Sequence, residues 1–417
     1  MAEPTNTPMP PSTPVPASTP RSSSPAPPLP SLSPNAIRSA ISPAGRIAPV
    51  RPTVLHIGDP IKYNPATYAE FSQIFEVIRP SAAERERSEF IRALKERRWG
   101  DFSAIFRPFW GTGGEMGCWD AGLIDLLPDS VKVFASAGAG FDWADTRLLG
   151  EKGIIYCNSG LAAAEAVADF AVAMIISTFR HLPWCMAAAT VADPSQAGSL
   201  ARAAFHDCHD RATAVSHNPR GHVLGLIGFG NIGQQIAAKL GNAAFGMRIA
   251  YYDIVRKPAK IESSLHATFH PTLESLIRTS DCLVLCAPAS TDGKPLVTAS
   301  TFHSIRRGTR FVNVARGSLV DEDALADAIE AGTISAAALD VHANEPKVNP
   351  RLVRMATQIT AEGIPGPGRV MLTCHNAGGT VETHIGFEEL SMRNIMAVLR
   401  GQPPITPVNL EFVRAKS

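Results

Sequence analysis

Residues 223–233 have the sequence VLGLIGFGNIG, in which a short apolar run leads directly into three glycines spaced Gly-x-Gly-x-x-Gly. Such a glycine pattern is weak evidence alone, because loops use glycine freely, but here it follows a predicted strand and opens a predicted helix at 231–240. In that context Gly228 allows a tight turn, Gly230 lets the backbone approach a pyrophosphate, and Gly233 allows close packing of helix on strand. The pattern therefore predicts a dinucleotide-binding unit rather than an ordinary turn.

An acidic residue lies where such a unit needs one. Asp253 follows Gly233 by twenty residues, at the end of the next predicted strand. A carboxylate there would accept hydrogen bonds from the adenosine ribose and repel a 2′-phosphate, which favours NAD over NADP. Arg256 and Lys257 follow directly and could neutralise a 2′-phosphate, so NADP stays open as the less favoured cofactor.

Apolar runs closed by turn residues continue on both sides of this unit. After the first strand, at 222–227, strands are predicted at 248–253, 282–286, 310–314 and 336–341, with helical segments between them. Before it, strands are predicted within 53–60, at 104–106 and at 131–135, together with helices at 87–97 and 165–179. This alternation predicts an α/β protein with a parallel sheet and helical crossovers in the first part of the chain and a doubly wound parallel sheet from residue 222 onward.

The overall composition is that of a globular chain large enough for two hydrophobic cores. Its 417 residues include 39 basic and 38 acidic side chains, a balance that gives no long-range field to attract nucleic acid or an anionic membrane. The longest apolar stretch, 166–177, is shorter than the ~20 residues that span a bilayer and contains Asp169, so we expect a buried helix. The seven scattered cysteines predict reduced thiols in an intracellular protein.

The first fifty residues differ from the rest of the chain. They contain fourteen of the 34 prolines, mixed with Ser, Thr and Ala, and show no apolar periodicity that could offset the entropy of ordering. We therefore expect residues 1–51 to be disordered. A mitochondrial transit peptide would also be rich in Ser and Arg, but this much proline opposes its amphipathic helix, so we expect a cytoplasmic protein, with mitochondrial import less favoured.

Three polar side chains each follow a predicted strand: Arg316, Glu345 and His375. Doubly wound sheets bind ligands at the carboxyl ends of their strands. A guanidinium can hold a carboxylate by two parallel hydrogen bonds and polarise a neighbouring carbonyl. A carboxylate beside an imidazole stabilises the protonated ring, which can then protonate a carbonyl oxygen. Each residue alone would fit a surface or structural role, but together they suit the reduction of a 2-oxo acid.

One further cluster has the residue types of a metal site. Residues 206–210 have the sequence HDCHD, but these ligands are crowded and no partner cluster lies at the spacing that zinc sites show. We predict a polar loop there and no metal site.

With these motifs in this order, the chain resembles the D-isomer-specific 2-hydroxyacid dehydrogenases from about residue 52 to residue 410. The resemblance implies a Rossmann cofactor domain inserted into a discontinuous substrate domain of flavodoxin-like topology, with crossing helices at 165–179 and 387–399. It also implies a homodimer formed through the cofactor domain. The implied bounds are 1–51 for the tail, 52–160 and 380–412 for the substrate domain, and 161–379 for the NAD-binding domain.

The resemblance further implies residue roles. Arg316 would bind the substrate's carboxylate and carbonyl, Glu345 would orient His375, and His375 would transfer the proton. The backbone of Ala139 and Gly140 would bind the substrate carboxylate. The implied cofactor-binding residues are Gly228, Gly230, Asn231, Ile232, Gly233, Asp253, Cys286, Pro288, Ala315 and Asp340, with Cys286 and Pro288 at the adenine and Asp340 at the nicotinamide carboxamide.

Two segments, HNPRGHVLG at 217–225 and AGAGFDW at 137–143, look most like the fungal D-mandelate dehydrogenase branch of that family. The resemblance implies the NADH-dependent reduction of a bulky or aromatic 2-oxo acid to the D-2-hydroxy acid. Phe109 and Trp110 could form an aromatic wall for such a substrate or could equally belong to the core. Two alternatives stay open: a glyoxylate or hydroxypyruvate reductase, and a non-catalytic NAD(H)-sensing protein similar to corepressors of this fold.

Overall fold

The computed structural model describes residues 51–413, except for 109–115, 191–196, 291–292 and 358–365. All but the last residue of the predicted disordered tail lies outside the described residues. Phe109 and Trp110, the predicted aromatic wall, lie outside them as well.

Five parallel strands form the first sheet, in the order β2-β1-β3-β4-β5. This is the flavodoxin-like order, in which the chain moves outward from β1 in both directions and leaves a switch point between β1 and β3. The strands are β1 (Thr53–His56), β2 (Glu76–Ile78), β3 (Ala104–Arg107), β4 (Val133–Ser136) and β5 (Ile155–Cys157). The helices between them are α1 (Pro65–Ile74), α2 (Arg87–Lys95), α3 (Ala121–Ile124) and α4 (Thr146–Glu151).

Seven parallel strands form the second sheet, in the order β12-β11-β10-β9-β6-β7-β8. This is the Rossmann order with one strand added, and its switch point lies between β6 and β9. The strands are β6 (Val223–Ile227), β7 (Arg248–Tyr252), β8 (Ala267–Phe269), β9 (Cys282–Leu285), β10 (Thr309–Asn313), β11 (Ile334–Leu339) and β12 (Val370–Leu372). The helices along them are α8 (Asn231–Leu240), α9 (Ala259–Leu265), α10 (Leu273–Ile277), α11 (Ala299–Ser304), α12 (Glu322–Glu330) and α13 (Pro350–Ala356). The predicted pair of doubly wound parallel sheets is confirmed.

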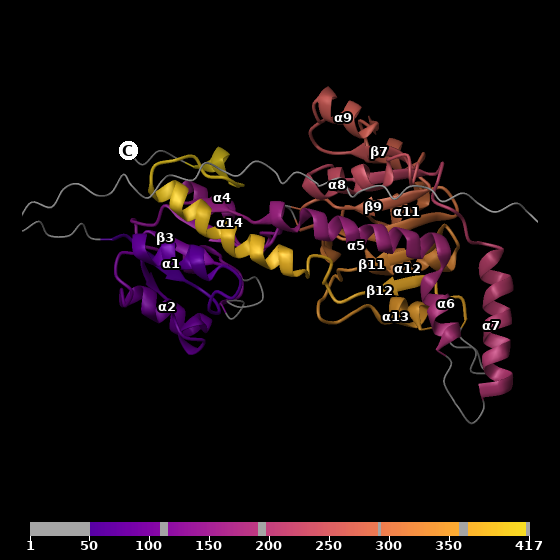
Figure 1. Ribbon diagram of the computed structural model, residues 1–417, viewed down its shortest axis with the longest axis horizontal. Helices are drawn as coiled ribbons and strands as arrows, with labels where there is room; N and C mark the ends of the chain where they lie inside the picture. Colours follow the sequence, from indigo (N-terminus) through magenta and orange to yellow (C-terminus); the bar gives the residue numbers. More distant parts are fainter. Residues whose placement is uncertain (1–50, 109–115, 191–196, 291–292, 358–365, 414–417) are drawn as a thin grey trace, which may run out of the picture. The chain divides into compact units, whose positions relative to one another are not determined.

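Two long helices connect the sheets along the chain. α5 (Gly160–Arg180) packs on α8, β10 and β11 of the second sheet, while α14 (Val381–Leu399) returns to pack on β3 and β4 of the first (Figure 1). They also contact each other. The chain thus leaves the first sheet, builds the second and comes back, as the predicted insertion requires, although the predicted domain bounds remain predictions.

α5 is longer than predicted and is the one helix in the described part of the chain with the length and apolar composition to cross a membrane. One such helix is weak evidence for a span, since core helices pass the same test. The side chains of Ala168, Ala171, Met174 and Ile175 are fully buried. They lie in the core between α5 and the second sheet, so the prediction of a buried helix is confirmed.

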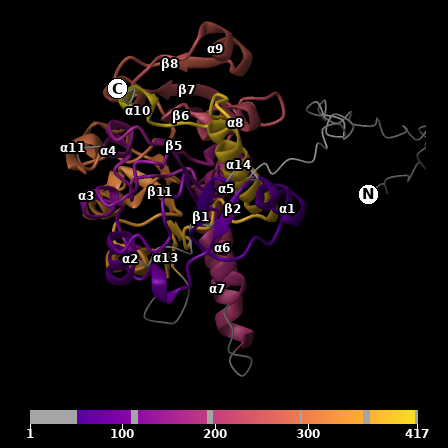
Figure 2. The same ribbon diagram turned by 90° about the vertical axis from the view of Figure 1, so that its left-hand side faces the viewer.

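Beyond α5 the chain forms two more helices, α6 (Leu182–Ala189) and α7 (Ala197–Thr213), which pack side by side (Figure 1). In the turned view α7 projects away from the two sheets (Figure 2). The prediction of a polar loop at 206–210 is wrong, because this segment lies inside α7. Ala204, Cys208 and Ala212 recur every four residues and are buried in one cluster with α6. Because alanine and cysteine are small, their four-residue spacing does not stand out in the sequence as the apolar face of a helix.

Candidate active site

The glycine turn after β6 has the geometry that its sequence predicts. Gly228 has a φ of +96°, and a Cβ atom there would lie 2.8 Å from the backbone of Ala287. A Cβ atom at Gly233 would lie 2.6 Å from the carbonyl oxygen of Gly228. A Cβ atom at Gly230 would meet nothing within 4 Å. Two glycines therefore close the turn by tight packing, while Gly230 presents an open face.

The start of α8 lies at this open face. Gly230 is its N-cap, and no side chain caps the helix there. The first-turn N–H groups, at Asn231, Ile232 and Gly233, and the positive end of the helix dipole suit a pyrophosphate. The open backbone at Gly230 and the uncapped helix together fit a bound dinucleotide, with the pyrophosphate at this turn.

The cations near Asp253 are both engaged by carboxylates. Lys257 Nζ lies 3.0 Å from Asp253 Oδ2, which also accepts a 2.8 Å hydrogen bond from the Phe229 amide. Arg256 donates two hydrogen bonds of 2.9 Å to Glu262 and holds the pKa of that carboxyl down to about 2. Neither cation stands as an unpaired ligand for a 2′-phosphate, which supports the preference for NAD.

Two variants separate the packing role of these glycines from their binding role. Gly228→Ala is expected to lower the Tm, since a non-glycine residue in such a backbone conformation costs about 1–3 kcal/mol and its Cβ would collide with Ala287. Gly230→Ala has room for its methyl group and should keep the wild-type Tm, but it should raise the Kd for NADH at least about tenfold by crowding the pyrophosphate. Thermal unfolding and fluorescence titration measure both. Unchanged NADH binding in Gly230→Ala would remove the turn from the cofactor site.

Glu345 and His375 are in contact. His375 Nδ1 lies 2.8 Å from Glu345 Oε2, and each side chain is 34% exposed. The other carboxylate oxygen, Oε1, accepts a 2.8 Å hydrogen bond from the His342 amide. The loop after β11 therefore fixes the carboxylate, and the carboxylate fixes one nitrogen of the imidazole.

The backbone of His375 is held in an unusual conformation. Its φ is +55°, in the left-handed region, which costs a non-glycine residue on the order of 1 kcal/mol. Its amide donates a 2.7 Å hydrogen bond to the carbonyl oxygen of Asp340. Such a conformation persists only where the surroundings enforce it, and it is common in functional loops.

The buried carboxylate of Asp340 supplies that enforcement. Its Oδ1 accepts hydrogen bonds from the Thr373 hydroxyl at 2.7 Å and the Asn376 amide at 2.9 Å, and its Oδ2 accepts one from the Ala377 amide at 2.8 Å. These bonds use three of about four acceptor positions of a carboxylate. Asp340 thus organises the loop that carries His375, a role that sequence reasoning missed, while its assignment to the nicotinamide stays a prediction.

Arg316, in the loop after β10, contacts the loop that follows β4 of the first sheet. Its Nε lies 3.0 Å from Asp142 Oδ1, and its Nη1 donates a 2.8 Å hydrogen bond to the carbonyl oxygen of Ala315. A Cβ atom at Gly140 would lie 1.2 Å from Arg316 Nη2, so the guanidinium occupies the space that a side chain there would need. The structure therefore brings Arg316 together with the predicted loop at Ala139 and Gly140. The structure also places Asp142 in the site. This residue lies within the segment AGAGFDW at 137–143, but the sequence alone gave no reason to assign it a role.

The loops that carry these side chains follow neighbouring strands, β10, β11 and β12, at one edge of the second sheet. Asn313 shapes the first loop, donating to the Arg316 carbonyl and accepting from the Ala315 amide, both at 3.0 Å. A Cβ atom at Gly317 would lie 1.9 Å from the backbone carbon of His342, so the first two loops pack backbone to backbone. The Arg316 loop thus directly adjoins the loop that fixes Glu345.

The remaining predicted cofactor residues occupy different positions at this edge. Cys286 lies under the glycine turn, where its thiol donates to the Gly228 carbonyl at 3.1 Å and burial raises its pKa to about 12. Pro288 is exposed, and Ala315 is buried. The assignment of Cys286 and Pro288 to an adenine pocket stays a prediction. Within the described ranges there is no group of three or more His, Cys, Asp or Glu side chains that could hold a metal ion.

Comparison with known proteins places this site in a family. Residues 174–362 match the model of the D-isomer specific 2-hydroxyacid dehydrogenase NAD binding domain. The chain is 30% identical over 357 residues to 4-methyl-2-oxopentanoate reductase A of Aspergillus oryzae, covering 86% of this chain and 98% of that one. It is 32% identical over 300 residues to a glyoxylate reductase of Thermococcus gammatolerans, covering 71% and 81%.

A solved structure supports the same family. The apo form of D-mandelate dehydrogenase from Rhodotorula graminis is 38% identical, with a TM-score of 0.76 over 86% of this chain and 98% of that chain. The predicted resemblance to the mandelate dehydrogenase branch is thus confirmed, and NAD is the cofactor class of the matched domain. The chain belongs to the D-isomer specific 2-hydroxyacid dehydrogenases, oxidoreductases with a dinucleotide-binding domain.

Proposed function

We propose that the protein uses NADH to reduce a bulky 2-oxo acid, branched or aromatic, to the D-2-hydroxy acid. The contact of His375 Nδ1 with Glu345 at 2.8 Å, beside the loop of Arg316, carries this proposal. The names of two similar proteins support the substrate class, since one is a 4-methyl-2-oxopentanoate reductase and another a D-mandelate dehydrogenase.

Each side chain has a part in this chemistry. Glu345 holds Nδ1 of His375 and stabilises the protonated ring, so that Nε2 is the nitrogen that gives a proton to the carbonyl oxygen. Bound NADH supplies the hydride for the carbonyl carbon. Arg316 has Nε committed to Asp142 and Nη1 bonded to the Ala315 carbonyl, which leaves Nη2, beside Gly140, to hold the substrate carboxylate and to polarise the carbonyl.

Glu345→Gln should lower kcat without loss of the fold. The amide keeps the size of the side chain but cannot stabilise an imidazolium by charge. A hydrogen bond to a charged group contributes roughly 1.5–3 kcal/mol, so we expect kcat to fall about 10- to 100-fold. Steady-state kinetics measure the loss, and NADH binding serves as the control because Glu345 lies outside the glycine turn. A kcat within twofold of wild type would show that Glu345 is not needed to orient or charge His375.

Substrate choice is tested by oxidation of NADH and NADPH with phenylglyoxylate, 4-methyl-2-oxopentanoate, hydroxypyruvate and glyoxylate. The proposal expects kcat/KM with NADH to be at least about tenfold higher for the two bulky acids. The reverse order would favour the glyoxylate or hydroxypyruvate reductase. Tight NADH binding with no turnover of any acid would favour the NAD(H)-sensing protein instead.

The proposal includes a homodimer in the cytoplasm. Leu182 and Met186 on α6 are 38% and 67% exposed, and a second copy covering this helix would remove apolar surface from water. Light scattering on the purified chain, with Met186→Asp as comparison, would test the dimer. Fractionation of cells would test the location, with recovery in mitochondria favouring the transit-peptide alternative.

A further inference from the structure

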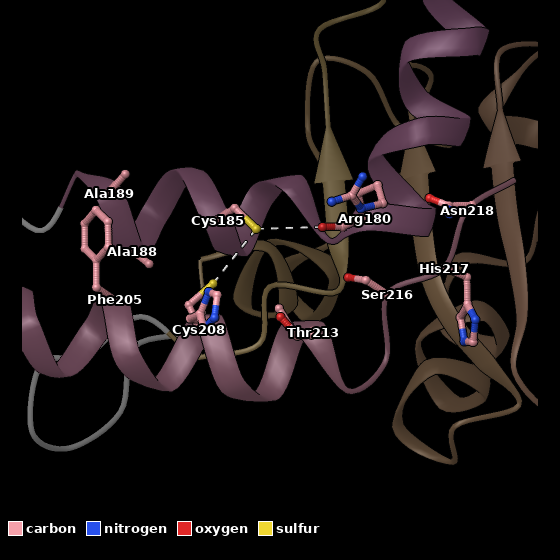
Figure 3. A pocket seen from close by; sticks show the side chains of 12 residues that line it. Arg180, Cys185, Ala188, Ala189, Phe205, Cys208, Thr213, Ser216, His217 and Asn218 are labelled. Atoms are coloured by element: carbon pink, nitrogen blue, oxygen red, sulfur yellow. Dashed lines mark hydrogen bonds between the residues drawn. The ribbon is translucent and has the colours of Figure 1, made fainter. Parts of the chain in front are cut away.

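A cavity of about 550 Å³ lies between α6 and α7, far from the site described above. α5 begins beside Ala139 and runs for 21 residues, or about 30 Å, before α6 starts. The lining includes Arg180, Cys185, Ala188, Phe205, Cys208 and His217 (Figure 3). This cavity therefore has no part in the reaction at His375.

Two thiols from different helices meet in this cavity. Cys185 Sγ on α6 lies 3.9 Å from Cys208 Sγ on α7, the separation of two thiols in contact (Figure 3). Cys185 is exposed, while Cys208 is buried in the cluster that joins the two helices. A disulfide has sulfurs ~2.05 Å apart, so the two sulfurs must approach by about 2 Å. Rotation of the exposed Cys185 side chain can supply much of this movement.

We propose that Cys185 and Cys208 form a reversible disulfide, a redox modification site whose oxidant is a hydroperoxide such as hydrogen peroxide. This inference is independent of the proposed function. The Cys185 thiol loses its proton, and the thiolate sulfur attacks one oxygen of hydrogen peroxide. The O–O bond breaks, the sulfur becomes a sulfenic acid, and the hydroxide that leaves takes up the proton as water. The Cys208 sulfur then attacks the Cys185 sulfur, the S–S bond forms, and a second water leaves. Two thiols are oxidised, one peroxide is reduced, and a dithiol reductant reverses the bond by exchange.

The surroundings of the two thiols determine which of them reacts with the peroxide first. Cys185 is exposed in the single chain and reacts with a dissolved oxidant there; a second copy covering α6 would slow this step. Burial, followed by the neighbouring Cys185, raises the pKa of the Cys208 thiol to about 11, so Cys208 is the less reactive thiol toward a peroxide. Its closeness to Cys185 makes it the resolving partner, because a held neighbour reacts at a high effective concentration.

The test uses the full chain, reduced, freed of reductant and treated with hydrogen peroxide under native conditions. Thiol titration in denaturant should fall from seven to five per chain and return to seven after treatment with dithiothreitol. Mass spectrometry of an unreduced digest should show one peptide pair, joined through Cys185 and Cys208 and lighter by two hydrogens. The oxidised protein should have a higher Tm, since the bond closes a loop between the helices.

Matched variants make the result specific. Cys185→Ser should lose the linked peptides, and Cys118→Ser, which removes another exposed thiol, should keep them. Cys208→Ser tests the same bond, and its reduced form is checked for wild-type circular dichroism because the site is buried. Oxidation of wild-type Cys185 to the sulfinic or sulfonic acid without a link, or a link to any other cysteine, would overturn the proposal.

Discussion

His375→Asn is expected to lower kcat by about 10²- to 10⁴-fold, the usual contribution of a positioned general acid. Asparagine suits this test because it tolerates the left-handed backbone found at His375, where φ is +55°. The hydrogen bonds from the loop to Asp340 come from backbone amides and from Thr373, so the substitution leaves them in place. The loop should therefore keep its shape while it loses the proton donor.

Pre-steady-state and steady-state rates with the best bulky 2-oxo acid measure this loss. The Kd for NADH and the Tm should stay at their wild-type values, since neither depends on the imidazole. If His375→Asn retains more than about a tenth of the wild-type kcat, a loss of under 1.4 kcal/mol, the proton must come from another group and the assignment of His375 is wrong.

Gly140→Ala is expected to give a folded protein with little activity. The added methyl group would occupy the position of Arg316 Nη2, 1.2 Å away, and the end of a long side chain can move aside without disturbing the core. The displaced guanidinium could no longer hold the substrate carboxylate or the developing charge on the carbonyl. Loss of such a donor lowers kcat about 10²- to 10³-fold, and we expect kcat/KM to fall by at least that much.

A double-substitution cycle distinguishes this mechanism from a local disturbance. Arg316→Gln alone should cause a loss similar to that of Gly140→Ala, and the double variant should be no worse than Arg316→Gln, because both changes remove the same interaction. Additive losses would mean that Gly140 acts on its own, for example through its backbone. A large drop in the Tm of Gly140→Ala would show that the methyl group displaces more than the arginine.

The parts of the fold that followed from sequence are those with a strong local signal. The helix at 231–240 was predicted to the residue, because a glycine turn starts it and a regular apolar face continues it. The strands Glu76–Ile78, Ile155–Cys157 and Ala267–Phe269 were missed. Each has three residues and lies at one end of its sheet, so the apolar run is too short to stand out from a loop.

In the candidate site, too, some features follow from the sequence and others do not. Arg316, Glu345 and His375 could be selected because each follows a strand, and parallel strands bring their carboxyl ends to one edge. The placement of Asp142 and Gly140 against Arg316 could not be predicted from the sequence, since it depends on contact between loops from two different sheets. No periodicity or spacing encodes such a contact. Asp340 was selected for its position, but its hold on the His375 loop rests on hydrogen-bond geometry that only the structure shows.

The contact of Arg316 with Gly140 and Asp142 has a consequence for hybrid enzymes that combine domains of two relatives. A chimera that takes its first sheet from one relative and its second from another could fold, since each sheet has its own core. Its arginine would still meet whatever residues the other parent supplies at positions 140 and 142. Recombination within this family should therefore preserve structure more often than turnover, and restoring the pair of Gly140 and Asp142 is the first repair to attempt in an inactive hybrid.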